Sequence, residues 1–223
     1  MTVHTATPFD GAPVAPERVW YASYGSNMHM DRLAAYLVGG TLPGATRTYP
    51  GCRDRRAPER SLAVELAGRL YFATESPVWT GGRAFYDPTA PGRTRGRAHL
   101  VTIGQLSDIA AQEMYEEPGT DLDLTVVLRE GRHEVGPGRY ETLICPGAIE
   151  GVPVLTFTAP WTLRDVDTTV PSAAYLRHLA GGLLESGSWE ERHIADYLAA
   201  SPGAAGSWTA RQVLRLLTAD VRP

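Results

Sequence analysis

The chain has 223 residues, with 21 arginine or lysine residues against 25 aspartate or glutamate residues, and its net charge is −4. This acidic balance argues against a general nucleic-acid-binding protein, which would show a basic excess. Every basic residue is arginine, so chemistry that requires a lysine, such as a Schiff base, is excluded. The same bias, with abundant Ala, Gly and Pro, is typical of a bacterial genome of high GC content.

The chain begins with a segment rich in Thr, Pro, Gly and Ala, and we expect residues 1–17 to be a disordered tail. This segment has neither a basic nor an apolar stretch, so it is not predicted to be a secretory signal. Strand-forming residues predict a first strand over 19–24, which Gly25-Ser26-Asn27 ends. From Met28 the apolar spacing is helical, and Gly39-Gly40 terminates that helix.

The composition over 42–60 is typical of a loop, and the following stretch is rich in strand-forming residues. We predict two strands within 61–76, one over 83–86 and one over 98–103. The pattern Thr102-x-x-Gln105 is a capping box, which predicts a helix from about Gln105 to Glu117. Further strands are predicted over 122–128, 140–145 and 152–157.

The last third of the chain has helical periodicity, and helix starts are predicted at Ser172, at Ser188 and after Ser207. The sequence shows no internal repeat and no clear interdomain linker. The simplest organisation is one α+β domain over 18–200, with a C-terminal helical extension over 201–223 packed on the same domain.

The two cysteines, Cys52 and Cys145, lie far apart and form no C-x-x-C pair. A disulfide framework and a thiolate zinc site are therefore excluded. Two free thiols in a reducing cytoplasm are expected, with one disulfide as the alternative. No apolar stretch reaches the length of about 18 residues that would span a membrane. We therefore expect a cytoplasmic protein that binds neither membrane nor nucleic acid.

The loop Tyr24-Gly25-Ser26-Asn27 is the first candidate for chemistry. A glycine between a strand and a helix start leaves successive backbone N–H groups pointing at free space, where they suit a carboxylate or a phosphate. Ser26 or Asn27 would also cap the helix. The alternative is an ordinary helix cap with no ligand.

Glu113 is the second candidate. On the predicted helix, Leu106, Ile109 and Ala110 form an apolar stripe, and position 113 continues that stripe at the next helical repeat. A carboxylate on a buried face is costly unless it is paired, and a general acid or base in a cavity needs such a group. The alternative is a helix end that turns outward and leaves Glu113 in solvent.

Other signals are weaker. Gly82 and Arg83 follow an aromatic residue and a further glycine, so the backbone there would let a ligand approach, although a turn is the commoner meaning. The sequence contains no H-E-x-x-H, G-x-S-x-G or G-x-G-x-x-G motif, and no metal site or cofactor is predicted.

Four segments together resemble the γ-glutamylcyclotransferase-like family. The first, over 21–28, resembles its Y-G-S-N signature, and Trp79-Thr80-Gly81-Gly82 resembles its W-x-G-G strand entry. Glu113, preceded by Gln112, stands where the family has its catalytic glutamate, and the segment from Pro171 to Tyr175 is similar to its P-S-x-x-Y helix. The order and spacing of all four segments agree, and they cover roughly residues 19–198.

The resemblance implies a small mixed β-barrel with surrounding helices and a helical C-terminal end. It also implies an enzyme that releases an amine and 5-oxoproline from a small-molecule γ-glutamyl amide, by attack of the substrate's own α-amino group, without metal or cofactor. Glu113 would then be the catalytic residue. Binding of the substrate is expected to involve the following residues: Tyr24, Gly25, Ser26, Asn27, Gly82, Arg83 and Tyr175.

The sequence departs from the family pattern after Glu113. Family members often continue with E-G and a Tyr-x-Arg strand, whereas this chain has Met114-Tyr115-Glu116-Glu117 and then Leu122-Asp123-Leu124-Thr125. We therefore expect the wall that faces the leaving amine to differ, and glutathione not to be the chief substrate.

Three alternatives remain open from the sequence. The same fold and glutamate would serve a γ-glutamyl acyltransferase or an amidohydrolase. A non-catalytic module would keep the anion-binding loop but would have no need of a buried base. A zinc deacylase is disfavoured because its ligand set is missing.

Overall fold

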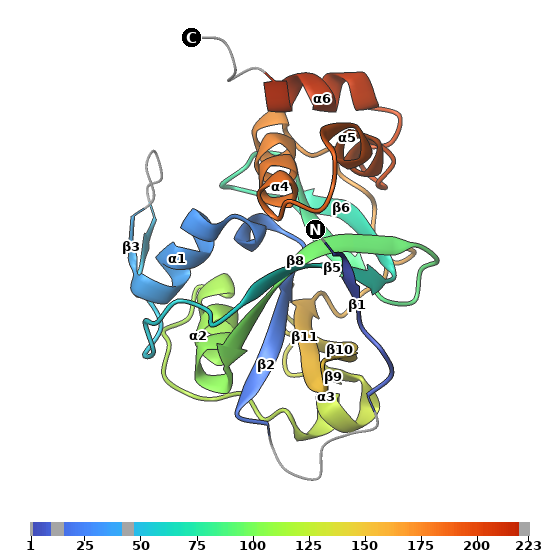
Figure 1. Ribbon diagram of the computed structural model, residues 1–223. Helices are drawn as coiled ribbons and strands as arrows, with labels where there is room; N and C mark the ends of the chain where they lie inside the picture. Colours follow the sequence, from blue (N-terminus) through green and yellow to red (C-terminus); the bar gives the residue numbers. More distant parts are fainter. Residues whose placement is uncertain (1, 10–15, 42–46, 219–223) are drawn as a thin grey trace.

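The computed structural model describes residues 2–9, 16–41 and 47–218 (Figure 1). Its centre is a seven-stranded mixed sheet. In spatial order the strands are β1 (His4–Thr5), β5 (Ser61–Ala67), β8 (Arg93–Thr102), β2 (Arg18–Ser23), β11 (Val152–Thr158), β10 (Thr142–Ile149) and β9 (Arg132–Glu134). Two short two-stranded sheets pair β3 (Gly40–Thr41) with β4 (Thr48–Tyr49) and β6 (Arg69–Glu75) with β7 (Gly82–Asp87).

Strand β2 lies near the middle of the large sheet, antiparallel to β8 and parallel to β11. Both of its faces are buried, which explains its nearly continuous apolar sequence. Val19 and Tyr21 face one core cluster, whereas Trp20 and Ala22 face the other. The two-residue repeat of a strand thus divides the interior of the protein into two cores.

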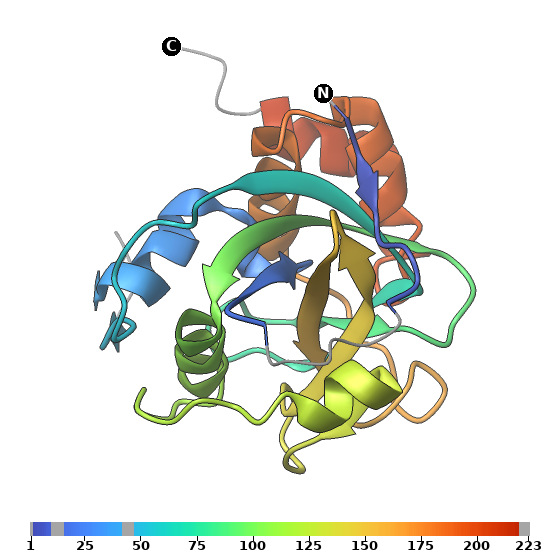
Figure 2. The same ribbon diagram turned by 60° about the horizontal axis from the view of Figure 1, so that its bottom comes forward.

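The helices cover the sheet from two sides, as Figure 2 shows, with α2 and α3 away from α4–α6. Their bounds are α1 (Met30–Val38), α2 (Ile103–Glu113), α3 (Thr125–Glu130), α4 (Ala173–Glu185), α5 (Glu191–Ala199) and α6 (Ala210–Thr218). Leu179 of α4, Ile194 of α5 and Val213 of α6 belong to the same core cluster as Trp20. Leu33 of α1 and Ile109 of α2 belong to the second cluster.

The mixed α+β class is confirmed, whereas closure of the sheet into a barrel is not. The order of strands ends at β1 and β9, and no ladder joins these two strands in the described part of the chain. A single antiparallel bridge connects Thr7, just after β1, to Ala148 of β10. Because β1 has only two residues, its backbone pairing does not extend far enough to close the sheet into a barrel.

The N-terminal segment differs from the disordered tail that its composition predicts. Residues 4 and 5 form β1 and pair in parallel with β5, and Thr7 exchanges two backbone hydrogen bonds with Ala148. Residues 1 and 10–15 lie outside the described part of the chain. Backbone pairing, which composition does not encode, accounts for the difference.

Residues 125–130 form a helix, and the strand predicted over 122–128 is wrong. The side chain of Asp123 accepts a hydrogen bond from the backbone N–H of Thr125 at 2.8 Å, which favours a turn over an extended chain. Gly131, with a φ of 78°, ends the helix in the left-handed conformation. A local side-chain-to-backbone bond and a glycine therefore override the strand-forming residues Val126 and Val127.

Helix boundaries follow their caps. The capping box of Thr102 and Gln105 is present, but α2 ends at Glu113 instead of continuing to Glu117. Ser172 accepts a hydrogen bond from the N–H of Tyr175 and caps α4 as predicted. Helix α5 starts after Glu190 instead of at Ser188. No helix within the described ranges is both long enough and apolar enough to cross a membrane.

His99 makes the stability of the fold sensitive to acid. Burial lowers the pKa of this completely buried imidazole to about 3. The unfolded chain would bind a proton below a pKa of about 6.5, while the folded chain excludes it. Stability is therefore complete above this pH and falls as the pH decreases toward 3, by at most about 1.4 kcal/mol per pH unit.

We expect His99→Gln to flatten this pH dependence, measured as the free energy of unfolding in urea at several pH values between neutrality and about pH 4. The two proteins are compared by the slope of their free energy of unfolding against pH, so a difference in their stability at neutral pH does not affect the test. Equal slopes for the two proteins would contradict the assignment.

Candidate active site

A pocket of about 350 Å³ opens beside the segment that follows β2. Its lining consists of residues 21–27 together with Ala84, Glu113, Tyr140, Thr156, Phe157 and Tyr175. The loop, the end of α2, strand β7, strand β11 and helix α4 all contribute. The pocket brings together six of the eight predicted site residues, namely Tyr24, Gly25, Ser26, Asn27, Glu113 and Tyr175.

The loop does not lead directly into an α-helix. Ser26–Met28 form a single 3₁₀ turn, His29 is extended with a ψ of 128°, and α1 begins only at Met30. The dipole of α1 therefore does not stand directly behind the loop, and neither Ser26 nor Asn27 caps it. Within the described residues, the N–H groups of Gly25, Ser26 and Asn27 have no acceptor, which leaves three backbone donors at the pocket.

Asn27 connects the loop to Glu113. Its side-chain Nδ2 donates to Oε1 of Glu113 at 2.9 Å and to the hydroxyl of Tyr21 at 3.2 Å. The Oδ1 atom of Asn27 is buried and has no donor among the described residues. A buried amide with both donors used and its acceptor free is suited to receive an N–H group of a ligand.

Glu113 is the last residue of α2, and its side chain is half-buried. Leu106, Ile109 and Ala110 pack into the core, while Glu113 is turned to the pocket by the end of the helix. Arg139 donates from Nη2 to the backbone carbonyl of Glu113 at 3.0 Å, which satisfies an oxygen that the helix leaves free.

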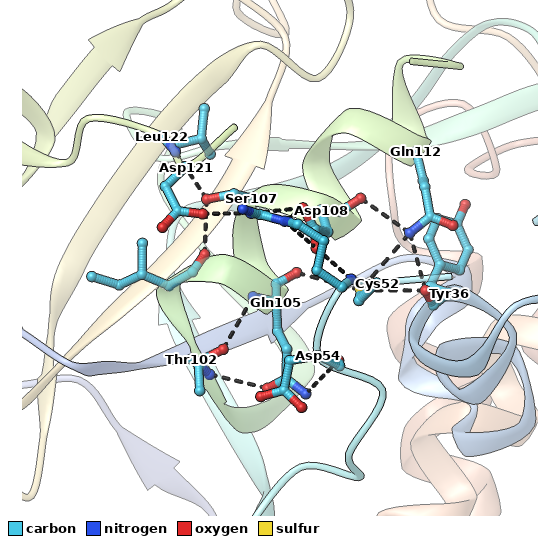
Figure 3. Close-up of polar contacts among 12 residues, drawn as sticks. Tyr36, Cys52, Asp54, Thr102, Gln105, Ser107, Asp108, Gln112, Asp121 and Leu122 are labelled. Carbon is cyan, nitrogen blue, oxygen red and sulfur yellow. Dashed lines mark hydrogen bonds and ion pairs between the residues drawn. The ribbon is translucent and has the colours of Figure 1, made fainter. Parts of the chain in front are cut away.

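Gln112, beside Glu113, locks the end of α2 in place (Figure 3). This fully buried amide donates to the carbonyl oxygens of Tyr36 at 3.0 Å and of Asp108 at 3.1 Å. Its oxygen accepts from the N–H of Gly51 at 3.3 Å. The orientation of Glu113 is therefore determined by a polar cluster that joins α2 to α1 and to the loop before β5.

Asp108 extends this cluster along α2 (Figure 3). The fully buried carboxylate accepts from the backbone N–H of Arg53 at 2.8 Å and pairs with the guanidinium of Arg53 at 2.9 Å. Because a buried carboxylate must be paired, this contact specifies one position of the loop on the helix.

Tyrosine hydroxyls surround the pocket. Tyr24 donates to the carbonyl of Phe157 at 2.9 Å, and Tyr140 donates to that of Ala84 at 3.0 Å. Tyr175 accepts from the N–H of Ala84 at 3.3 Å. Burial raises the pKa of Tyr175 to about 12 and keeps the pKa of Tyr24 and Tyr140 well above 10, so all three are neutral hydroxyls at ordinary pH.

Gly82 and Arg83 have different positions. Gly82 does not line the pocket. A Cβ atom at this position would meet the carbonyl oxygen of Thr169 at 2.1 Å. Its role is therefore close packing of β7 against that backbone. Arg83 lines a second pocket, of about 470 Å³, that adjoins the first.

The two pockets share Ser26, Glu113, Tyr140 and Tyr175. We call the pocket beside the 24–27 loop the inner pocket and the second one the outer pocket. The outer pocket also contains Arg32, Arg47, Tyr115 and Arg139, which sequence reasoning did not single out. The local sequence offers one signal for this pocket, the adjacent cation and aromatic ring of Arg139 and Tyr140 in a loop.

Comparisons with known proteins inform on the fold but not on the chemistry. No protein-family model matches the chain. The chain is 30% identical over 205 residues to Histone deacetylase 5 of Arabidopsis thaliana. This match covers 84% of the chain but 31% of the plant protein, so the chain spans about a third of that relative's length.

Among solved structures, a human protein described as uncharacterized protein loc79017 matches with a TM-score of 0.51 and 15% identity. The match covers 91% of this chain and 99% of the human one. The chain has the fold of that human protein. A structure described as gamma-glutamyl cyclotransferase gives a TM-score of 0.48 at 14% identity, over 91% of this chain and 99% of that chain. That description names the activity of the family that the sequence motifs resemble.

Proposed function

We propose that this protein is a γ-glutamyl cyclotransferase-like enzyme that converts a γ-glutamyl amide into 5-oxoproline and a free amine. The observation that carries the proposal is the hydrogen bond of 2.9 Å between Asn27 and Glu113, at the junction of the inner and outer pockets. It joins the Y-G-S-N loop to the glutamate, two of the four segments on which the family resemblance rests.

In this proposal the inner pocket holds the glutamyl group in a folded conformation. The N–H groups of residues 25–27 bind its polar oxygens, and the free Oδ1 of Asn27 accepts a hydrogen bond from the α-ammonium group. Because the nucleophile is tethered to the electrophile, holding one conformer supplies an entropic advantage of up to about 7–11 kcal/mol.

Glu113 then transfers protons in two steps. Its carboxylate takes a proton from the α-ammonium group, and the α-nitrogen attacks the γ-carbonyl carbon to form the five-membered ring. As the bond from this carbon to the leaving nitrogen breaks, Glu113 returns the proton to that nitrogen. Once the ring has formed, the α-nitrogen loses a second proton, which passes through the same carboxylate to the departing nitrogen. The products are 5-oxoproline and the protonated amine, so atoms, protons and charge balance.

Transfer or hydrolysis of the same acyl group is the second candidate, and it would use the same glutamate. Detection of 5-oxoproline separates the outcomes, since hydrolysis releases glutamate and transfer releases a new γ-glutamyl amide. The name of the plant relative suggests deacetylation, but we do not propose it. In the described part of the chain, no group of three His, Cys, Asp or Glu side chains could hold a metal ion.

The experiment is a steady-state assay of 5-oxoproline release from a panel of γ-glutamyl amides. We expect the panel to spread over orders of magnitude in kcat/KM, with glutathione among the poor substrates. The physical reason is that Tyr115, within the departure from the family pattern, lies in the outer pocket. A lost apolar contact changes kcat/KM by about 10–200-fold, and an unpaired polar contact changes it by more.

If glutathione is the best substrate, the prediction about the amine is wrong. If no amide in the panel releases 5-oxoproline, the proposed function itself is wrong.

A further inference from the structure

One face of α4 packs against the loop that lines the inner pocket. Tyr175, His178 and Gly182 are spaced three and four residues apart, so they lie on the same face of the helix. The hydroxyl of Tyr175 lies 3.7 Å from where a Cβ atom at Gly25 would stand. A Cβ atom at Gly182 would lie 2.8 Å from the Cβ atom of Met28, so glycine at this position lets the loop approach the helix closely.

His178 makes a hydrogen bond from this face to the loop. Its Nε2 atom lies 3.0 Å from the backbone carbonyl oxygen of Ser26. A carbonyl oxygen can only accept, so Nε2 carries the proton and donates it. Burial lowers the pKa of His178 to about 4, so the imidazole is neutral at ordinary pH and the contact with Ser26 selects its tautomer.

Neighbouring side chains hold the imidazole ring in this orientation. The centres of the Trp79 and His29 rings lie 4.9 Å and 4.7 Å from the centre of the His178 ring. Nδ1 of His29 lies 3.0 Å from one carboxylate oxygen of Glu185, and Arg97 pairs with the other oxygen at 2.8 Å. Because His178 packs against two rings, one of which is itself anchored, its Nε2 atom has little freedom to turn away from the loop.

The hydrogen bond sets the direction of the peptide group between Ser26 and Asn27. In a planar trans peptide the carbonyl and the following N–H point in opposite directions. Since the carbonyl of Ser26 faces His178, the N–H of Asn27 points the other way, and it has no acceptor among the described residues. The backbone N–H of His29 also donates to this carbonyl, at the longer distance of 3.3 Å. His178 itself lines neither pocket, so it can affect a ligand there only through the loop.

We propose that His178 is a positioning residue, whose hydrogen bond to Ser26 turns the N–H of Asn27 toward a glutamyl group in the inner pocket. The inference rests on the proposed function for the identity of this ligand. A donor that is oriented before the ligand arrives strengthens binding, because no rearrangement of the loop opposes it. The side chain of the same Asn27 holds Glu113 at 2.9 Å, so the orientation of this segment also affects the carboxylate.

The test uses three substitutions that differ in the donor they place beside Ser26. His178→Gln puts an amide N–H near the position of the imidazole Nε2, His178→Asn puts one near the position of Nδ1, and His178→Leu has no donor. Affinity is measured by calorimetric titration with a non-cleavable γ-glutamyl analogue. We expect binding about 3–10-fold weaker in the Leu and Asn variants, as the loss of one hydrogen bond allows, and affinity close to that of the parent in the Gln variant.

The comparison of Gln with Asn separates positioning from packing, because both variants lose the ring and its contacts with Trp79 and His29. His193→Leu is the matched control, since His193 is exposed on α5 and lines neither pocket, and its affinity should equal that of the parent. If His178→Leu does not fold, the Gln and Asn variants decide the question. Unchanged affinity in His178→Leu, or equal losses in the Gln and Asn variants, would overturn the proposal.

A second measurement needs no ligand and keeps this inference separate from the proposed function. The backbone amide resonance of Asn27 is compared by NMR between His178→Gln and His178→Asn, which both lack the imidazole ring, so the effect of the ring on the chemical shift cancels. We expect different shifts, because only the Gln side chain holds the carbonyl of Ser26. Equal shifts would contradict the role of His178. If the analogue does not bind the parent protein, the proposed function fails, and the NMR comparison still decides whether His178 orients the loop.

Discussion

Glu113→Gln is expected to lower turnover by about 10²–10⁴-fold while the protein remains folded. The amide keeps the size of the carboxylate and can still contact Asn27, but it cannot accept and return a proton. The half-buried side chain makes no ion pair with any described residue, so its loss leaves no buried charge unpaired.

The measurement is single-turnover or steady-state release of 5-oxoproline, with circular dichroism and a thermal midpoint to establish folding. Glu116→Gln is the matched control, since Glu116 is an exposed carboxylate just beyond the end of α2. A rate for Glu113→Gln close to that of the parent would remove Glu113 from the mechanism.

Gly25→Val is expected to abolish ligand binding while much of the fold survives. A Cβ atom at Gly25 would meet only the hydroxyl of Tyr175, at 3.7 Å, which is ordinary contact. The backbone of Gly25 has a φ of −111°, which side chains tolerate. The added methyl groups would therefore fill the inner pocket instead of displacing the protein around it.

Calorimetry with a non-cleavable γ-glutamyl analogue tests this expectation, and Gly25→Ala should give an intermediate loss of affinity. Gly119→Val is the control, because a Cβ atom at Gly119 meets nothing within 4 Å and the residue does not line either pocket. Unchanged affinity in Gly25→Val would show that the loop is not the binding site.

Several local features follow from the sequence alone. The apolar run of β2, the capping box at Thr102 and Gln105, and the cap at Ser172 are each encoded within a few residues. Propensity, periodicity and capping bonds act over such distances. The prediction of a strand over 122–128 was wrong because two local signals compete there. The hydrogen bond from the N–H of Thr125 to the side chain of Asp123 outweighs the strand preference of the β-branched residues.

Tertiary packing decided how the candidate site is assembled. Asn27 and Glu113 are 86 positions apart, and their hydrogen bond exists because Gln112 and Asp108 fix α2 against α1 and the loop before β5. The charge of the outer pocket is likewise absent from the local sequence. All of the basic residues are arginines, and composition does not distinguish those that pair with carboxylates from those that line the outer pocket.

The sequence by itself therefore determined the strand before the loop, the helix that carries Glu113 and the motif resemblance that suggests the chemistry. Only the tertiary structure decided that Gly82 serves packing, that the loop enters a 3₁₀ turn, and that Arg32, Arg47, Arg83 and Arg139 converge. The physical reason is that local bonds are specified by neighbouring residues. Convergence of distant side chains depends on which faces the two cores bury, and long-range packing sets those faces.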